Sequence, residues 1–347
     1  FGLAGGCYIL TDDGPQPIND GLIAGNFNAF GGDGVIFDND GFLTPQIDRI
    51  SFNLLSRYEF SRQAELFFEA KYVRQETYFG TTQNSYYDLL RVSADNPFIP
   101  AVLQDVADTH DGLYITRDPT DLGPNKDTNI SETYRFVGGI EGEFPNGFSY
   151  ELSANYGRYE LETINRNNVL LDRFFAAIDV TTDANGNPVC RSEIDPTVRS
   201  PSTIFGIPTG EFGYLTFVPG SGECVPANIL GGPQSISQEA VDFITTTTRN
   251  NYTTEQLDIF GIVVGDTDDF LMLPYDGLDF ALGFEFRDEA SRSEFDPLVR
   301  GILPVTTVDG NAGDFVGDLG FSQTSLATPP DQFLQNSGGG YSVFELF

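Results

Sequence analysis

Hydrophobic and polar residues alternate along several segments of the chain, a period of two that is typical of β-strands with one apolar face. In residues 50–60 the even-numbered positions are mostly apolar, beginning with Ile50 and Phe52, whereas the odd-numbered positions are mostly polar. Residues 64–73 repeat the pattern after a tight turn at Ser61–Gln63. The two segments therefore predict a β-hairpin.

The same pattern predicts two further hairpins. Residues 134–144 and 148–157 flank Pro145–Gly147, whose sequence Pro-Asn-Gly favours a tight turn. Residues 257–264 and 278–287 flank a longer turn, and the orientation of residues 257–264 is ambiguous because apolar residues occupy both of its faces. The sequence therefore predicts three antiparallel strand pairs.

The connections between these hairpins are much longer than the turns within them. Residues 77–132, 159–254 and 289–340 form expected loops of about 55, 95 and 50 residues, which is uncommon in compact soluble domains. Short turns on one side and long loops on the other are typical of an outer-membrane β-barrel. A seventh strand begins near Tyr341, so further strands from beyond the ends or from other chains are needed for closure.

Charge is also sorted by face. Charged residues gather opposite the apolar face: Arg57, Glu65, Glu69, Lys71, Arg135, Glu141, Glu151, Asp279, Glu285 and Arg287. Lys or Arg facing lipid at mid-depth costs roughly 2–4 kcal/mol, so this sorting is expected where the other face touches lipid. Aromatic residues beside the tight turns suit a girdle at the membrane interface: Tyr58, Phe60, Phe144, Phe148 and Tyr150. The alternative is a soluble β-sandwich or propeller, which would have shorter loops.

The long loops contain helical patterns. Residues 97–107 predict a short helix after Pro100, and residues 168–179 show helical spacing of apolar side chains. Residues 235–244 begin with an N-cap candidate at Ser235 or Ser237. We therefore expect a mainly β protein whose long loops carry short helices.

Composition narrows the function classes. The chain has 347 residues with 18 Lys plus Arg against 51 Asp plus Glu, a formal net charge of −33. Such a chain repels polyanions, so no nucleic-acid partner is expected. The sequence contains no apolar run long enough for a transmembrane helix. It begins at Phe1 without a signal peptide and stops at Phe347 within a strand pattern, so we interpret it as part of a longer mature protein.

The three cysteines allow one loop staple. Cys190 and Cys224 lie in the same long loop with 33 residues between them. In an oxidising compartment they form a disulfide worth roughly 3–4 kcal/mol on the entropic model, and otherwise they are two free thiols. Cys7 has no evident partner in the sequence, and it either pairs outside this sequence or stays free.

Metal binding and catalysis have little support. The acidic runs Gly31–Gly34, Asp38–Gly41 and Asp266–Asp269 resemble calcium-binding loops, but position 12 counted from Asp38 is Arg49, so no EF-hand is completed. We interpret these runs as solvated turns and expect no metal or cofactor. His110 is the only histidine and no GxSxG motif occurs, so we expect no enzymatic activity.

Several segments resemble the barrel domain of TonB-dependent outer-membrane receptors, in a subgroup with large extracellular loops. They are Asp48–Thr77 (DRISFNLLSRYEFSRQAELFFEAKYVRQET), Asn167–Asp179 (NNVLLDRFFAAID), Cys190 with Gly222–Gly231 (GECVPANILG), Ala240–Leu257 and Leu278–Phe295. The resemblance implies a 22-stranded barrel in the outer membrane of Gram-negative cells, filled by an N-terminal plug whose TonB box contacts the energy-transducing complex. It also implies that the two loop cysteines are paired. On this expectation residues 1–347 are part of the barrel domain, with plug and C-terminal strands absent from this sequence.

The function that this resemblance implies is TonB-coupled uptake of a scarce bulky solute: a siderophore, cobalamin, haem or an oligosaccharide. Lipid and lipopolysaccharide would surround the barrel. The alternatives are a passive porin-like barrel and a secreted soluble β protein that binds calcium or glycans. The solute itself is not indicated by the sequence.

Overall fold

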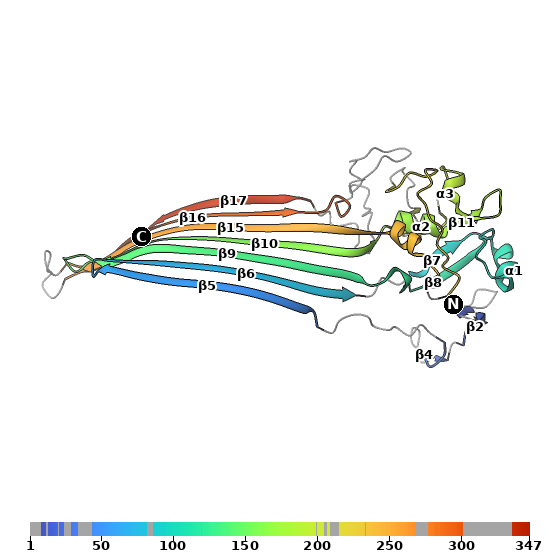
Figure 1. Ribbon diagram of the computed structural model, residues 1–347, viewed down its shortest axis with the longest axis horizontal. Coiled ribbons are helices and arrows are strands. Elements are labelled where there is room, and N and C mark those ends of the chain that lie inside the picture. The colour runs from blue at the N-terminus through green and yellow to red at the C-terminus, as the bar shows by residue number, and fades with distance from the viewer. Residues whose placement is uncertain are drawn as a thin grey trace.

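The computed structural model contains one long β-sheet with a compact group of loops and helices at one end (Figure 1). The structure describes residues 8–11, 13–19, 21–23, 29–33, 44–81, 86–118, 120–198, 200–204, 207–208, 215–232, 234–267, 277–300 and 335–347. The sheet and the loop group differ in where their apolar residues lie. Many large apolar residues of the sheet are exposed, whereas those of the loop group form a buried core.

Seven antiparallel strands form the sheet, in the order β17-β16-β15-β10-β9-β6-β5. Their bounds are β5 Gln46–Ser61, β6 Ala64–Thr81, β9 Asn125–Glu143, β10 Ser149–Val169, β15 Thr245–Asp266, β16 Asp279–Glu294 and β17 Ser337–Leu346. Strands that are neighbours in the sequence are also neighbours in the sheet, apart from short strands in the loops. The three hairpins predicted from the sequence are therefore confirmed, and the fold is mainly β and antiparallel.

The turns within the hairpins are short because their residues suit them. Arg62 and Gln63 alone separate β5 from β6. Between β9 and β10, the amide of Gly147 donates to the carbonyl of Phe144 at 2.9 Å, and Gly147 adopts a φ of +82°. A residue with a Cβ is disfavoured in that conformation, which explains the glycine. The third turn was expected over residues 266–277, of which 268–276 lie outside the described residues.

The strands extend further toward the loops than the apolar pattern predicts. We expected loops over 77–132, 159–254 and 289–340, but β6 runs to Thr81, β10 to Val169 and β16 to Glu294. The expected loop boundaries were therefore wrong. Inter-strand pairing continues because polar residues, many of them β-branched threonines, replace the apolar face without breaking the ladder.

The register settles the orientation of the third hairpin, which the sequence left ambiguous. Ile259 pairs with Phe286, and Val263 pairs with Leu282. These residues share a face with Leu152, which pairs with Gly261. The odd-numbered positions of β15 therefore belong to the apolar face.

The other elements of the chain are short. They are β1 Tyr8–Thr11, β2 Gly14–Pro17, β3 Leu22–Ile23, β4 Ala29–Phe30, β7 Tyr86–Val92, α1 Ala101–His110, β8 Leu113–Arg117, the 3-10 helix η1 Thr120–Leu122, α2 Leu171–Ile178, β11 Val180–Thr182, β12 Pro188–Cys190, α3 Arg191–Ile194, β13 Thr203–Ile204, β14 Ile207–Pro208 and α4 Gln238–Ile244. The three loop helices expected from the sequence are present as α1, α2 and α4. Ser237 caps α4 by accepting the amide of Ala240 at 3.2 Å.

The loops between β6 and β9 and between β10 and β15 pack into one body, which we call the cap. It comprises residues 86–118, 120–124 and the described part of 170–244. Its core joins Leu90 and Leu103 of the first loop to Phe174, Phe217 and Ile244 of the second. The largest hydrophobic core in the described residues therefore lies in the cap, whereas the sheet is one layer thick.

Within the described residues the sheet does not close on itself. Its outermost strands, β5 and β17, each pair with a neighbour on one side only. The structure therefore shows an open antiparallel sheet and no closed barrel in this part of the chain. In the same residues no helix is both long and apolar enough to cross a membrane.

The cap core generates a stability prediction. Phe174 is fully buried, so Phe174→Ala leaves a cavity and should destabilise the cap by about 3–5 kcal/mol. Hydrogen exchange of the cap amides should speed up accordingly. Val102→Ala, at a position that is 60% exposed, is the control and should leave exchange unchanged. Equal effects of the two substitutions would contradict the assignment of this core.

Candidate functional site: an apolar sheet face and its charged border

The apolar face of the sheet is exposed. Leu66 is 42% exposed, Phe68 43% and Leu152 46%. Along the first part of β10, Leu152, Ala154 and Tyr156 are exposed, whereas the polar residues between them are half-buried. This is the reverse of a water-soluble sheet, in which apolar side chains are the covered ones.

We call this surface the outward face, and strand pairing defines its members row by row. One row runs Ser56, Phe68, Gly138, Ala154, Ile259, Phe286 and Phe344. The next row toward the tight turns runs Tyr58, Leu66, Ile140, Leu152, Gly261, Phe284 and Leu346. Neither row contains a charged residue, so an uncharged band crosses all seven strands.

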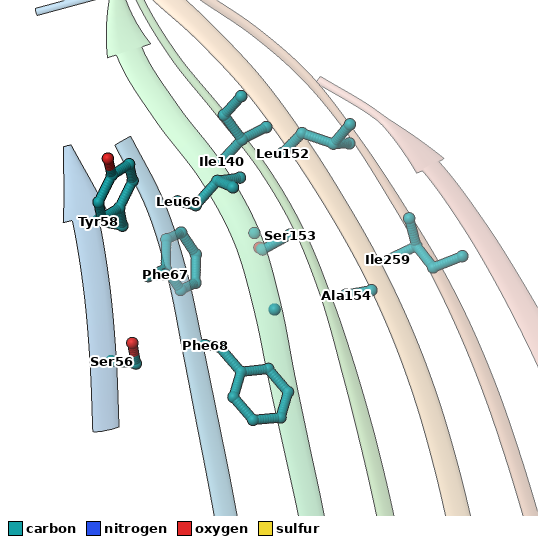
Figure 2. Close-up of a pocket in the computed structure, with 12 residues that line it drawn as sticks. Ser56, Tyr58, Leu66, Phe67, Phe68, Ile140, Leu152, Ser153, Ala154 and Ile259 are labelled. Atoms are coloured by element: carbon teal, nitrogen blue, oxygen red, sulfur yellow. The ribbon is translucent and has the colours of Figure 1, made fainter. Parts of the chain in front are cut away.

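A shallow depression of about 620 Å³ lies in this band (Figure 2). Residues of β5, β6, β9, β10 and β15 line it, among them Tyr58, Phe68, Ile140, Leu152 and Ile259. The floor is low because Gly138 occupies the outward position between Phe68 and Ala154. The depression is apolar and open, so its chemistry suits a hydrocarbon chain.

A charged border begins at the side of the band nearer the cap. The first charged outward residue on each strand is Asp48 on β5, Arg74 on β6, Glu132 on β9, Arg158 on β10, Glu255 on β15 and Asp288 on β16. Asp48 pairs with Glu76 and so lies one row nearer the cap than Arg74, which shares a row with Glu132. Arg158 and Glu255 share the next row toward the tight turns, and Asp288, which pairs with Leu257, lies one row further in that direction. The border therefore shifts by three rows over five strand steps.

This shift corresponds to an angle. A row is two residues, or roughly 6.6 Å, and neighbouring strands are about 4.8 Å apart. Three rows over five strand steps therefore give a displacement of roughly 20 Å over 24 Å, which is an angle of about 40° from the perpendicular to the strands. The border is thus oblique to the strands rather than perpendicular to them.

Tyrosines mark the start of this border. The hydroxyls of Tyr72 and Tyr134 donate to the two carboxylate oxygens of Glu132 at 2.7 and 3.1 Å. The ring centroids of the two tyrosines are 5.1 Å apart. Tyr72 and Tyr134 form the last uncharged outward row on their strands, and their hydroxyls contact the charged Glu132 of the next row. Each tyrosine therefore connects the uncharged band, to which its ring belongs, with the charged border that its hydroxyl contacts.

Beyond the tyrosines, the outward face carries ion pairs that link neighbouring strands. Arg158 of β10 lies 2.8 Å from Glu255 of β15, and Arg249 of β15 lies 2.7 Å from Glu162 of β10. Lys126 and Arg166 face outward nearer the cap. We call the charged outward residues between them and the band the outward belt: Asp48, Arg74, Glu76, Glu132, Arg158, Glu160, Glu162, Arg249, Glu255, Asp288, Arg292 and Glu294. It contains four arginines and eight carboxylates, so the belt is acidic overall.

The opposite, inward face is polar. Arg57 lies 2.9 Å from Glu65 and 2.8 Å from Glu141, so one guanidinium joins three strands near the tight turns. Arg135 donates to Asn155 at 3.0 Å. The side chains that the sequence assigned to this face by alternation are therefore brought together by the register.

A disulfide between Cys190 and Cys224 closes part of the cap, with a Cα–Cα distance of 6.1 Å. Glu193 supports the loop beside it by accepting the amides of Gly222 at 2.6 Å and Cys224 at 3.0 Å. The staple expected from the sequence is thus present in the structure. Cys7 lies outside the described residues.

Arginines tie the two loops of the cap together. Arg117 of β8 donates to the carbonyls of Ile229 at 2.9 Å and Gly232 at 3.1 Å and pairs with the buried Asp121. Arg191 lies 2.6 Å from Asp95 and 3.1 Å from Asp179. This pairing with Arg191 lowers the pKa of the Asp95 carboxyl, whereas burial raises the pKa of Asp179.

Asp172 is another buried acid of the cap. Its carboxylate accepts the amide of Thr216 at 2.5 Å and the hydroxyl of Thr216 at 2.9 Å. Burial raises the pKa of Asp172 even though these hydrogen bonds favour the charged form. The group fixes the 215–218 segment onto α2, and nothing beside it suggests a reacting partner.

The remaining candidates from the sequence are dispersed. Asp33 accepts the amide of Asn19 at 2.8 Å, which is a turn contact, whereas Gly34, Asp38–Gly41 and Asp268–Asp269 lie outside the described residues. His110 is exposed at the end of α1. Within the part of the chain that the structure describes, no three His, Cys, Asp or Glu residues come together as a metal site.

The chain matches no family model, no curated protein and no solved structure in the three comparisons made. The interpretation of this site therefore depends on its own geometry. Sequence reasoning missed the outward belt, although the alternation of Arg158, Glu160 and Glu162 with uncharged residues carries the signal.

The raised pKa values of Asp172 and Asp179 predict how the cap responds to pH. A carboxyl whose pKa is higher in the folded state than in the unfolded state favours folding when protonated, so stability falls as pH rises through that interval. In Asp172→Asn this fall should be smaller. The measurement is hydrogen exchange of cap amides between pH 4 and pH 7, corrected for the intrinsic exchange rate.

Asp195→Asn is the control. The hydroxyl and amide of Thr197 lower the pKa of Asp195, so its contribution is lost as pH falls rather than as pH rises. An unchanged pH slope in Asp172→Asn would contradict the role given to burial.

Proposed function

We propose that the sheet is part of a transmembrane β-barrel of the Gram-negative outer membrane, in a receptor for active uptake of a scarce bulky solute. The observation that carries this proposal is the oblique border of the uncharged band. Barrel strands tilt by about 35–45° from the membrane normal, so a membrane surface would cross them at that angle from their perpendicular. The border in this sheet lies at about 40°.

The height of the band supports the same proposal. Ile50 to Phe60 on β5 is ten residue steps, and Phe148, directly before β10, to Tyr156 on β10 is eight. They cover roughly 33 and 26 Å along the strands and, after correction for tilt, roughly 25 and 20 Å along the normal. Outer-membrane barrels have an apolar band about 25 Å tall. The strands then continue beyond the membrane and carry the cap on the extracellular side.

Aromatic residues flank the band on both sides. Tyr72 and Tyr134 lie at the border with the belt. Near the tight turns, the ring centroids of Tyr58 and Phe60 are 4.6 Å apart, and those of Phe144 and Tyr150 are 4.7 Å apart. Girdles of this kind are typical of both membrane interfaces.

The soluble alternative gives no partner for this face. Large apolar patches on soluble proteins are rarely left open, because their exposure costs roughly 25 cal/mol per Å². Here the patch crosses seven strands, and the cap core does not cover it. Lipid covers such a face without a second protein layer.

The open edges favour further strands. Unpaired amide and carbonyl groups cannot be left in hydrocarbon, so β5 and β17 require neighbours. The resemblance to TonB-dependent receptors supplies a 22-stranded barrel, with a plug outside these residues as the contact for TonB. Residues 1–347 would then be part of one barrel domain.

Lipid contacts follow from the proposed orientation. The depression around Phe68 and Leu152 would accept an acyl chain, and the outward belt would lie at the level of lipopolysaccharide headgroups. The four arginines of the belt suit phosphate groups, while divalent cations would bridge its carboxylates to them. No catalytic role is proposed for any residue.

The whole receptor should behave as an outer-membrane barrel that takes up its solute by an energised route. Unheated samples in detergent should migrate on gels as a folded form that boiling converts to the unfolded mobility. Uptake in cells should stop when TonB is removed. A detergent-free monomer would contradict the barrel, and TonB-independent permeation would support the passive porin instead.

A matched pair of arginine substitutions tests which face meets lipid. Ala154 faces outward at mid-band and Ser153 faces inward beside it on β10. Ala154→Arg should destabilise insertion by roughly 2–4 kcal/mol, because a lipid-facing arginine at mid-depth carries that cost. Ser153→Arg should have little effect.

The folded fraction of each variant after refolding into lipid bilayers measures the difference. Equal folded fractions, or a larger loss for Ser153→Arg, would reverse the assignment of the faces.

A further inference from the structure

The two faces of the sheet differ sharply between the border and the cap. Four central strands, β6, β9, β10 and β15, contribute an inward surface there, which we call the inner polar patch. It consists of Val73, Gln75, Thr77, Asn129, Ser131, Thr133, Tyr159, Leu161, Thr163, Asn250, Tyr252 and Thr254. None of these residues is charged.

On the same stretches of strand, five of the eight alternate residues that face outward are charged: Arg74, Glu76, Glu132, Glu160 and Glu162. Contact with lipid does not explain this difference in charge, because both faces lie beyond the uncharged band here. A sheet with water on both sides has no reason to keep charge off one of them. The neutrality of the inner polar patch therefore indicates something that the patch contacts.

Charge returns on the inward face directly below and above the patch. Lys71 and Arg135 lie one row below, and Asp127 lies one row above, where it accepts the side-chain amide of Asn165 at 2.7 Å. On the β5 side Arg49 pairs with Gln75, so the patch is a neutral zone bounded by charge on three sides rather than a general property of the inward face.

Hydroxyl and amide groups dominate the patch. The hydroxyl of Thr163 donates to Asn129 at 2.7 Å, and the amide of Gln75 donates to the hydroxyl of Thr77 at 3.3 Å. Ser, Thr, Asn and Gln both donate and accept hydrogen bonds, as the hydroxyls of a sugar do. The patch itself holds no positive side chain for an anionic chelate, and the cations nearest to it on the inward face are Lys71, Arg135 and Arg49, the last of which pairs with Gln75 from β5.

Two aromatic rings project from the same patch. Tyr159 and Tyr252 lie on adjacent strands with ring centroids 6.4 Å apart in an edge-to-face arrangement. Tyr252 is 39% exposed, so part of its ring is open to a ligand. An aromatic face beside hydroxyl and amide groups offers an apolar surface and hydrogen bonds together, and the two faces of a pyranose ring need both.

We propose that the inner polar patch binds a neutral, hydroxyl-rich ligand, specifically an oligosaccharide, with Tyr159 and Tyr252 as its stacking surface. This inference depends on the proposed function, since the inward face becomes the wall of a pore only in a closed barrel. It selects one substrate class among the bulky solutes considered.

The test uses the whole receptor in detergent and a matched pair of threonine substitutions. The probes are an array of short neutral oligosaccharides, an array of uronic-acid oligosaccharides of the same lengths, and a ferric trihydroxamate. The neutral array should bind. Thr254→Glu places a carboxylate in the patch and should weaken that binding at least about tenfold, because a charge must be desolvated against the neutral ligand.

Thr253→Glu is the control, since Thr253 neighbours Thr254 but faces outward, in the row of the belt that contains Glu160 and Arg292. The Thr253→Glu receptor should bind the neutral array as tightly as the unmodified receptor does. Tyr252→Ala should weaken binding, and Tyr252→Phe should keep most of it because the ring is retained. Heat-modifiable mobility on gels verifies that each variant is folded.

Equal effects of the two threonine substitutions would overturn the proposal, as would binding of the ferric chelate or the uronic acids in place of the neutral array. In those cases TonB-dependent uptake of the chelate or the uronic acids would leave the proposed function standing. Loss of heat-modifiable folding in the unmodified receptor would instead overturn the barrel itself.

Discussion

The pairing register of the seven-stranded sheet is the constraint on which the rest of the structure depends. Side chains alternate between faces at every residue, so a slip of one residue would exchange the two faces completely. With the observed register, Leu66, Ile140 and Leu152 share one row, while Glu65, Glu141 and Glu151 share the adjacent row on the other face. The apolar band, the oblique border and the inner polar patch all follow from this one alignment.

The cap depends on where the strands end. Helix α2 begins two residues after β10 ends, and α4 runs directly into β15, and the amide of Leu170 donates to the carbonyl of Ile244 at 2.9 Å. The second long loop is therefore anchored at both ends on paired strands. The first loop joins it through Arg117 and through the shared core around Phe174. The sheet supplies the position of the cap, and burial within the cap supplies its stability.

The sequence predicts the parts of this fold in which local chemistry decides. The strands around Phe136 and Tyr150 and the Pro145–Gly147 turn follow from alternation and turn propensity, and α1, α2 and α4 follow from spacing and capping. The extension of β6 and β10 toward the cap was not predicted, because alternation between polar side chains such as Thr163 and Glu162 gives no hydrophobic signal.

The packing of the cap could not be predicted from the sequence either, because it depends on contacts between residues that are distant in the sequence. The side-chain amide of Asn96 donates to the carbonyl of Ile178 at 3.2 Å, although the two residues are 82 positions apart in the sequence. No local sequence pattern predicts that contact. The border between uncharged and charged positions became visible only once the register related one strand to the next, although every residue in it is readable in the sequence.

The position of the disulfide within one loop bears on how the cap and the sheet can assemble. Cys190 and Cys224 lie within a single loop, so they can meet while the flanking strands are still unpaired. The core of the cap, in contrast, needs Leu90 and Leu103 from the other long loop and is complete only when β6, β9, β10 and β15 are side by side. Formation of the disulfide therefore does not require the assembled sheet, and a loop oxidised beforehand would reach its final position as a cross-linked unit rather than as an extended chain.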